Sequence, residues 1–119
     1  MQTFGFPKED RLRKRPEFLD LANNGEKIQD RHFIIVFQPN RDGKSRLGIT
    51  VTKRVGPAVT RNRIKRVSRE FFRLNRHQLQ GHWDLNIIAK HRAAAIDTGQ
   101  AHASLTRLFF RISKYAISQ

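Results

Sequence analysis

The segment that most restricts what this chain can fold into is residues 60–73, TRNRIKRVSREFFR. Apolar side chains recur in and just after it at intervals of three, four and three residues, at Ile64, Val67, Phe71 and Leu74. On a helix these positions fall within an arc of about 80°, the width of a stripe that faces a core. We therefore predict a long amphipathic helix from about residue 57 to residue 80, ended by Gly81.

The other side of this predicted helix is positively charged. A separate arc of about 100° holds Asn62, Lys65, Arg66, Arg69, Arg73 and Arg76. Glu70 is the only carboxylate between residues 60 and 76, so ion pairs within the helix cannot neutralise most of these cations. Arginine suits phosphate because its planar guanidinium donates two hydrogen bonds at once. The pattern favours phosphate binding over an ordinary solvated face, which would mix Glu with Lys.

The start of the same helix is a second candidate site. Lys53, Arg54 and Arg61 lie near it in the sequence, and a helix N-terminus offers free backbone N–H groups and a partial positive charge. A phosphate group would fit there. A helix start that merely has basic neighbours remains the alternative at this point.

The charge of the whole chain agrees with a polyanionic partner. Its 119 residues suit one domain, and they carry 24 Lys and Arg against 10 Asp and Glu, a formal net charge of +14. Nucleic acid is the commonest partner of so basic a protein; an anionic membrane and a basic protein without such a partner are the alternatives. The chain has no Cys, no long apolar run and no signal-peptide pattern, so we expect a cytoplasmic protein that does not bind a membrane.

The remaining elements follow from periodicity and breaks. We expect an extended basic arm over residues 1–14, a helix over 15–24, strands over 32–38 and 46–52 that form a hairpin, a strand over 83–90, and a last helix from Asp97 or Thr98. The apolar stripe of the last helix is Leu105, Leu108, Phe109, Ile112 and Ala116. This order, α-β-β-α-β-α, predicts one α+β domain, a two-layer sandwich of helices on a small mixed sheet.

No catalytic or metal-binding residue is predicted. A nuclease that acted without RNA would need close carboxylates for magnesium or a His pair for acid–base chemistry. The acidic residues are dispersed, and the five His residues include no pair spaced as zinc ligands. Independent catalysis and a zinc site are both disfavoured.

The sequence also resembles a known family. RLGITVTKRVGPAVTRNRIKRVSREFFR is similar to the basic signature of the bacterial ribonuclease P protein subunit, whose Arg-Asn-Arg hallmark is here Arg61, Asn62 and Arg63. RLRKRPEF, RHFIIVF and WDLNIIAK occur in the family's order and spacing. The resemblance therefore covers most of the chain.

This resemblance implies a function. Members of the family are small partners of a catalytic RNA that removes the 5′ leader from precursor tRNA, and the RNA with its bound Mg²⁺ ions carries out the hydrolysis. The protein would be a monomer in a 1:1 complex with the RNA subunit, and it would favour precursor over product by touching the leader. The family fold also implies a left-handed crossover between two parallel strands.

The resemblance further implies two groups of contact residues. The surface for the RNA subunit would consist of Lys53, Arg54, Arg61, Asn62, Arg63, Lys65, Arg66, Arg69 and Arg73. The single-stranded leader would lie between the first helix and the sheet and contact Phe18, Phe33, Lys90, Arg11 and Arg13. For either Phe a place in the core is the alternative. Ala22 and Val36 stand where relatives can have aromatic residues, which weakens base stacking there.

A ribosomal or general RNA-binding protein remains the alternative function. Such a protein would share the small size, the basic composition and the cationic helix. A preference for precursor over mature tRNA would separate the two possibilities.

Overall fold

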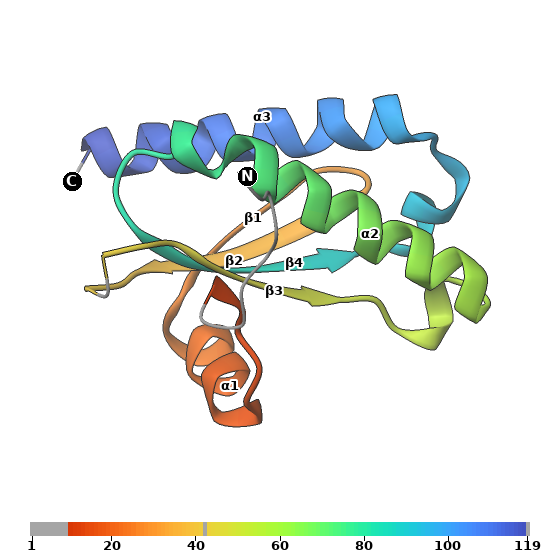
Figure 1. Cartoon of the computed structure of the whole chain (residues 1–119), viewed down its shortest axis with the longest axis horizontal. Helices are drawn as coiled ribbons and strands as arrows, with labels where there is room; N and C mark the ends of the chain where they lie inside the picture. Colours follow the sequence, from red (N-terminus) through yellow and green to blue (C-terminus); the bar gives the residue numbers. More distant parts are fainter. Residues whose placement is uncertain (1–9, 42, 119) are drawn as a thin grey trace, which may run out of the picture.

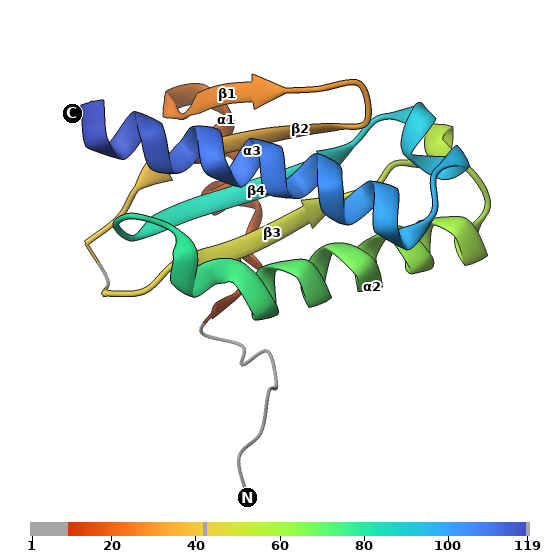
Figure 2. The ribbon, with the colours of Figure 1, turned by 90° about the horizontal axis from the view of Figure 1, so that it is seen from above.

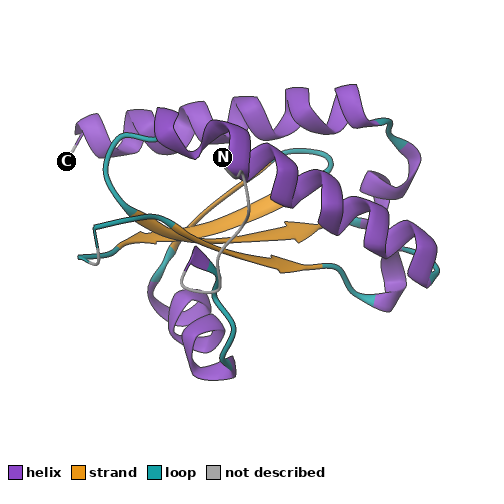
Figure 3. Cartoon of the chain, viewed as in Figure 1, coloured by secondary structure: helices purple, strands orange, loops and turns teal. Residues whose placement is uncertain are grey.

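The computed structural model describes residues 10–41 and 43–118. Its helices are α1 (Arg15–Asn24), α2 (Ala58–Asn75) and α3 (Thr98–Ser118), and its strands are β1 (Glu26–Gln29), β2 (Phe33–Pro39), β3 (Arg46–Thr50) and β4 (Trp83–Ala89). Three short 3₁₀ turns follow β3, α2 and β4: η2 (Lys53–Val55), η3 (Arg76–Gln78) and η4 (His91–Ala95). Figures 1 and 3 show α2 and α3 on one face of the sheet and α1 on the other. The predicted α+β sandwich on a mixed sheet is confirmed, and α1 covers part of its second face.

The strand order differs from the predicted hairpin. The sheet runs β1-β2-β4-β3, so β4 lies between β2 and β3 and the predicted pairing of residues 32–38 with 46–52 is wrong. β4 pairs antiparallel with β2 along seven residues and parallel with β3 along five. Six of its seven residues are buried, as expected of a central strand flanked on both sides.

The true hairpin joins β2 to β1, a strand that periodicity did not predict. β1 has the sequence EKIQ, in which only Ile28 is apolar and partly buried, so it has no hydrophobic alternation to recognise. It pairs antiparallel with β2, with Gln29 opposite Ile34. The connecting turn is held by Asp30, whose Oδ1 accepts hydrogen bonds from the backbone N–H groups of His32 and Phe33, both at 2.9 Å.

The main core lies between the sheet and the pair α2 and α3. Ile64, Val67 and Phe71 of the predicted α2 stripe are buried, but Leu74 is 47% exposed. Phe72 is fully buried instead, in a helix that contacts both β3 and α3. Four members of the α3 stripe are buried as predicted: Leu105, Leu108, Phe109 and Ile112. The side chain of the fifth, Ala116, lies outside the described part of the chain.

The connection from β3 to β4 has unusual handedness. The two strands are parallel neighbours joined through α2. If Figure 2 is turned so that both strands point upward, the chain passes from β3 through α2, on the near side of the sheet, to β4 on the left. The crossover is therefore left-handed, as the family resemblance implied, whereas about 98% of such connections are right-handed.

The predicted arm is only partly described. Residues 1–9 lie outside the described residues. Arg11 forms a parallel bridge with Leu47, and the backbone N–H of Leu12 donates to the carbonyl oxygen of Leu47 at 2.9 Å. The chain from Asp10 to Lys14 thus runs along the free edge of β3 before α1 begins.

Candidate nucleic-acid interface

The predicted cationic arc of α2 lies on the solvent side of the helix. Asn62, Arg66 and Arg69 are exposed, and Lys65 and Arg73 are half-buried. The opposite side of α2 contributes Ile64, Val67 and Phe71 to the core. The same amphipathic pattern that seats the helix on the sheet therefore directs its cations away from the protein.

Among residues 10–41 and 43–118, acidic neighbours of this arc are found only at its C-terminal part. Arg73 donates a hydrogen bond to Glu70, the single carboxylate of α2. Arg76, just after the helix, donates to Asp10 Oδ2 at 2.6 Å and lies 5.7 Å above the Phe72 ring. Burial raises the pKa of Asp10, but hydrogen bonds from Arg76 and Lys44 outweigh it and lower the pKa overall.

Two arginines of the Arg-Asn-Arg hallmark bind backbone rather than project freely. Arg61 Nη1 donates to the carbonyl oxygen of Gly56 at 2.9 Å. Arg63 donates to the carbonyls of Ile96 and Ala94, at 3.3 and 3.2 Å. Arg63 thereby fixes the segment after β4 to α2. Sequence reasoning missed this structural role, since the partners lie more than thirty positions away.

The turn before α2 presents two further predicted cations. Lys53 and Arg54 of η2 are exposed, whereas the next residue, Val55, is buried in the core. The backbone N–H of Val55 donates to the carbonyl oxygen of Thr52 at 3.0 Å, which closes the turn. η2 also packs against η4, so Lys53 and Arg54 lie on the side of the molecule that carries Lys90 and Arg92.

On the other face of the sheet, α1 is seated by a second small core. Leu12, Leu21 and Val36 are buried together, and Phe18, Ile34 and Ile88 pack against them partly exposed. The Phe18 ring lies directly over Gly48, where a Cβ atom would be 2.4 Å from Phe18 Cε1. The close approach of this ring requires a residue without a side chain on β3.

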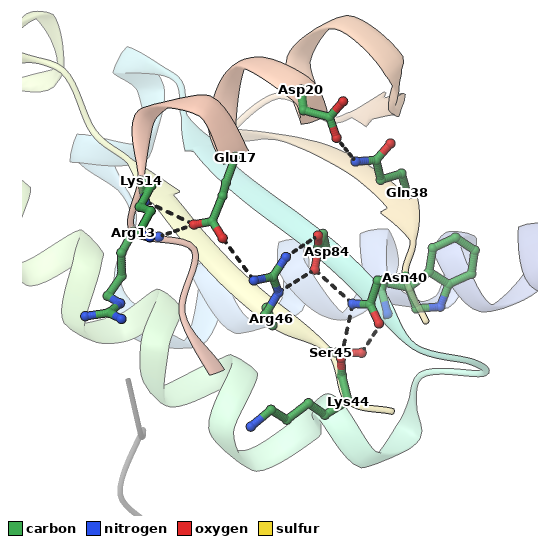
Figure 4. A network of polar contacts seen from close by, with 11 residues as sticks. Arg13, Lys14, Glu17, Asp20, Gln38, Asn40, Lys44, Ser45, Arg46 and Asp84 are labelled. Carbon is green, nitrogen blue, oxygen red and sulfur yellow. Dashed lines mark hydrogen bonds and ion pairs between the residues drawn. The ribbon is translucent and has the colours of Figure 1, made fainter. Parts of the chain in front are cut away.

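A network of ion pairs fixes the position of α1 (Figure 4). Arg46 of β3 donates to both carboxylate oxygens of Asp84, and its Nη1 donates to Glu17 Oε2 of α1 at 3.0 Å. Glu17 Oε1 accepts the backbone N–H groups of Arg13 and Lys14, at 2.9 and 3.0 Å. These two backbone hydrogen bonds, and the nearby Arg46, lower the pKa of Glu17 below its ordinary value. Asp84 in turn holds the pKa of Arg46 above its usual value.

Four of the five predicted leader contacts lie at the surface. Arg11 and Arg13 are exposed beside β3, and Phe18 of α1 is half-buried against Gly48. Lys90 is half-buried, and its Nζ donates to the carbonyl oxygen of Asp30 at 2.7 Å.

Phe33 is the exception, and the prediction that it contacts a leader is wrong. It is 1% exposed and belongs to the core beneath α2 and α3, on the opposite face from Phe18. Because successive side chains of a strand alternate between faces, Ile34 of β2 faces α1 instead. The alternative of a core position therefore holds for Phe33.

Around Lys90 the structure brings together cations that sequence reasoning had not grouped. An open depression of about 420 Å³ is lined by Asp30, Arg31, Lys90, His91 and Arg92. Arg31 precedes β2 and Arg92 follows β4, and these two strands are antiparallel neighbours. Knowledge of that pairing would have been needed to find the cluster.

The carboxylates of the described residues are engaged with other groups rather than gathered. Asp10, Glu17, Asp30 and Asp84 each take part in an ion pair with Arg or Lys. Among residues 10–41 and 43–118, no three His, Cys, Asp or Glu side chains lie close enough together to hold a metal ion. No helix in the described part of the chain is long and apolar enough to cross a membrane.

The fold and this surface define a class: a small basic α+β protein with a left-handed β3-α2-β4 unit and a cationic helix face directed to solvent. Residues 6–113 match the family Ribonuclease P. The chain is 52% identical over 114 residues to the "Ribonuclease P protein component" of Desulfatibacillum aliphaticivorans, covering 96% of this chain and 97% of the relative. It is 46% identical to the protein of the same name from Desulfosudis oleivorans, covering 96% and 94%.

Solved structures agree with these sequence matches. The RNase P protein from Thermotoga maritima superposes with a TM-score of 0.80 at 33% identity, covering 86% of this chain and 96% of that one. The Staphylococcus aureus RNase P protein gives a TM-score of 0.78 at 31% identity, covering 90% and 94%. The chain belongs to the ribonuclease P protein family.

Proposed function

We propose that this chain is the protein component of a ribonuclease P that matures the 5′ ends of tRNA, and that it acts by binding RNA. Its membership of the family supports the role in the enzyme. The observation that carries the RNA-binding part is the α2 face, where Arg66 and Arg69 are exposed and the single carboxylate of the helix is bonded to Arg73. Cations without acidic neighbours favour a phosphate backbone as the partner.

The RNA subunit would bind along α2 and η2. Lys53, Arg54, Lys65, Arg66 and Arg69 would supply charge, and Asn62 would donate or accept hydrogen bonds with a phosphate or a 2′-hydroxyl. Arg61 and Arg63 would act mainly by holding η2 and η4 in place, because their guanidinium groups already bind backbone carbonyls. Arg73 would contribute less, since Glu70 offsets its charge.

The precursor's leader would bind on the side of α1. Phe18 offers one partly exposed ring for stacking, and Arg11, Arg13 and Lys90 would contact phosphates. With Phe33 in the core and Ala22 and Val36 in place of aromatic residues, charge would contribute more than stacking to leader binding here.

Hydrolysis would be the work of the RNA subunit. No catalytic step is assigned to this chain. The Mg²⁺ ions of the reaction would be bound mainly by the RNA. The chain would act as one copy in a 1:1 complex, in the cytoplasm, where precursor tRNA is made.

The test is to measure the affinity of the assembled complex, with and without protein, for precursor and mature tRNA. We expect the protein to strengthen binding of the precursor more than that of the mature form. Equal strengthening of both would instead favour a general RNA-binding protein.

A further inference from the structure

A groove between the C-terminal part of α2 and the middle of α3 is not used by the surfaces described above. It has a volume of about 350 Å³, at the lower end of the range for small-molecule sites. Its apolar lining comes from Phe71, Leu79, Phe109 and Phe110. Phe110 is 65% exposed, although a large aromatic side chain on a soluble protein is usually covered.

The groove has a fixed aromatic floor. Phe71 and Phe109 meet edge to face with ring centroids 4.9 Å apart, and both are buried. Phe110 stands beside them at the mouth, with Lys114 Nζ 5.6 Å from its ring centroid. The floor is therefore preformed, and a ring face at the mouth is available for stacking.

The rim of the groove is polar in a particular way. Three amide side chains line it, those of Asn75, Gln78 and Gln80, together with the hydroxyl groups of Thr106 and Ser113. Asn75 Nδ2 donates to the carbonyl oxygen of Phe71 at 2.9 Å, which fixes that amide at the edge. The Gln80 carbonyl accepts from Trp83 Nε1 at 2.6 Å, which fixes the loop that carries Gln78 and Gln80. Amides offer a donor and an acceptor side by side, as the edges of nucleobases do.

Charge narrows the choice of ligand. The described residues that line the groove include one cation, Lys114, and no carboxylate. The ligand should therefore be flat and apolar on its faces, polar at its edges, and negatively charged next to the ring.

We propose that this groove binds one unpaired nucleotide of RNA, with its base stacked on Phe110, its edge within reach of the amides, and its phosphate at Lys114. The proposal rests on the RNA-binding function proposed above. Phe71 and Asn75 place the groove on the side of α2 that faces α3, away from the cationic arc, so a base there would make a contact separate from those of the arc. A base there would add a contact beyond those of the phosphate backbone.

Two other possible occupants of the groove can be distinguished from a nucleotide by experiment. The first is the N-terminal segment of this chain, which contains Phe4 and Phe6 and joins the described residues at Asp10, itself bonded to Arg76 at the end of α2. The second is another copy of the chain. Neither ligand accounts for three amides and a lysine around an aromatic floor, whereas a nucleotide would stack on the ring, hydrogen-bond to the amides and place its phosphate at the lysine.

The experiment combines a crosslink with a matched set of variants. A short unstructured oligouridine containing 5-iodouridine would be irradiated with the full-length protein, and the crosslinked peptide identified by mass spectrometry. Affinity for the same oligonucleotide and for the ribonuclease P RNA would be measured for Phe110→Ala, Phe110→Trp and Val59→Ala. Val59, 82% exposed on α2 and outside the groove, is the control for loss of a surface apolar side chain.

We expect a crosslink within α3 at Phe110. Phe110→Ala should abolish it and weaken oligouridine binding roughly 5- to 150-fold, the range for loss of one stacked base. Phe110→Trp should keep the affinity, because a larger ring also stacks, and Val59→Ala should behave as the wild type. Equal urea midpoints would exclude unfolding as the cause.

Three results would overturn the proposal. First, Phe110→Ala could bind RNA with wild-type affinity while Arg66→Ala/Arg69→Ala binds it more weakly. That result would exclude the nucleotide site and leave the RNA-binding function intact. A crosslink that appears only after deletion of residues 1–9 would identify the N-terminal segment as the resident ligand. Phe110-dependent dimerisation in sedimentation experiments would identify a second copy. If the Arg66→Ala/Arg69→Ala variant also bound normally, the RNA-binding function itself would fail.

Discussion

The Arg46 guanidinium binds the Asp84 carboxylate through two parallel hydrogen bonds, Nε to Oδ1 at 3.0 Å and Nη2 to Oδ2 at 2.8 Å. The pair joins β3 to β4, the two parallel strands on either side of the α2 crossover. Through Glu17 the same arginine also holds α1 against the sheet. Arg46 therefore connects β3 and β4, the strands on either side of the α2 crossover, with α1, beside which the leader is proposed to bind.

Removal of this arginine should destabilise the protein. Arg46→Ala would leave the largely buried Asp84 carboxylate without its guanidinium partner, and we expect a loss of roughly 2–3 kcal/mol in the free energy of unfolding. Urea denaturation measures this loss. Arg41→Ala, which removes an exposed arginine from the loop before β3, is the matched control and should change stability by less than about 0.5 kcal/mol. Similar small effects from both variants would show that the network contributes little.

The docking of α1 should depend on acid pH. Because the pKa of Glu17 is lower in the folded protein than in the unfolded chain, its contribution to stability is complete above the ordinary glutamate pKa of roughly 4.3. It should be lost as the pH falls below that value and through the lowered pKa. The measurement is the urea midpoint of the wild type and Glu17→Gln as a function of pH. The difference between them should be large at neutral pH and shrink in acid; a constant difference would contradict this assignment.

Any side chain at position 48 should destabilise the protein, because the Phe18 ring packs directly on Gly48. In Gly48→Ala the new methyl group would collide with the Phe18 ring, and we expect a loss of about 1–3 kcal/mol. Gly99→Ala is the control, since a Cβ there meets only Asp97 Oδ1 at 3.4 Å and alanine favours a helix, so stability should stay equal or rise. Adding Phe18→Leu to Gly48→Ala should recover part of the loss. Additive losses in that double variant would exclude a direct contact.

Arg63 and Arg66 should behave differently although they are near neighbours in one basic signature. Arg63→Ala removes two hydrogen bonds to the carbonyls of Ala94 and Ile96 and should lower stability by about 1–3 kcal/mol. Arg63→Lys keeps the charge but not the paired geometry, so most of that loss should remain. Arg66→Ala should leave stability nearly unchanged and weaken RNA binding. Equal stability of all three variants would show that Arg63 does not stabilise the contact between α2 and the segment after β4.

The salt dependence of RNA binding should show whether the cations of α2 contact phosphates of the RNA. With about six phosphates contacted, the slope of log affinity against log salt should be roughly −4 to −5. Arg66→Ala/Arg69→Ala should make it shallower by roughly 1.4–1.8, the contribution of two phosphates. Arg107→Ala/Arg111→Ala removes the same charge from α3 and should leave the slope unchanged. A change in the α3 variant alone would place the phosphate contacts on the other helix.

Much of this organisation could be predicted from local pattern. The spacing of Ile64, Val67 and Phe71 predicts both the α2 helix and the direction of its cations, because a helix converts sequence spacing directly into angle. The alternation in residues 46–52 predicts β3 in the same way. The net charge and the lack of acidic residues around the Arg-Asn-Arg sequence indicate a polyanionic partner without reference to any contact.

What the sequence by itself determined, then, was the type of each strong element, the sign of its surface and its family. Only the tertiary structure decided that β4 lies between β2 and β3, that Phe33 faces the core, and that Arg63 binds two carbonyls. It also brought Phe110 of α3 beside the amides at the end of α2 and just after it. Periodicity reports which face of an element is apolar, but strand pairing and side-chain partners depend on residues thirty or more positions apart, whose contacts form only when the whole chain packs.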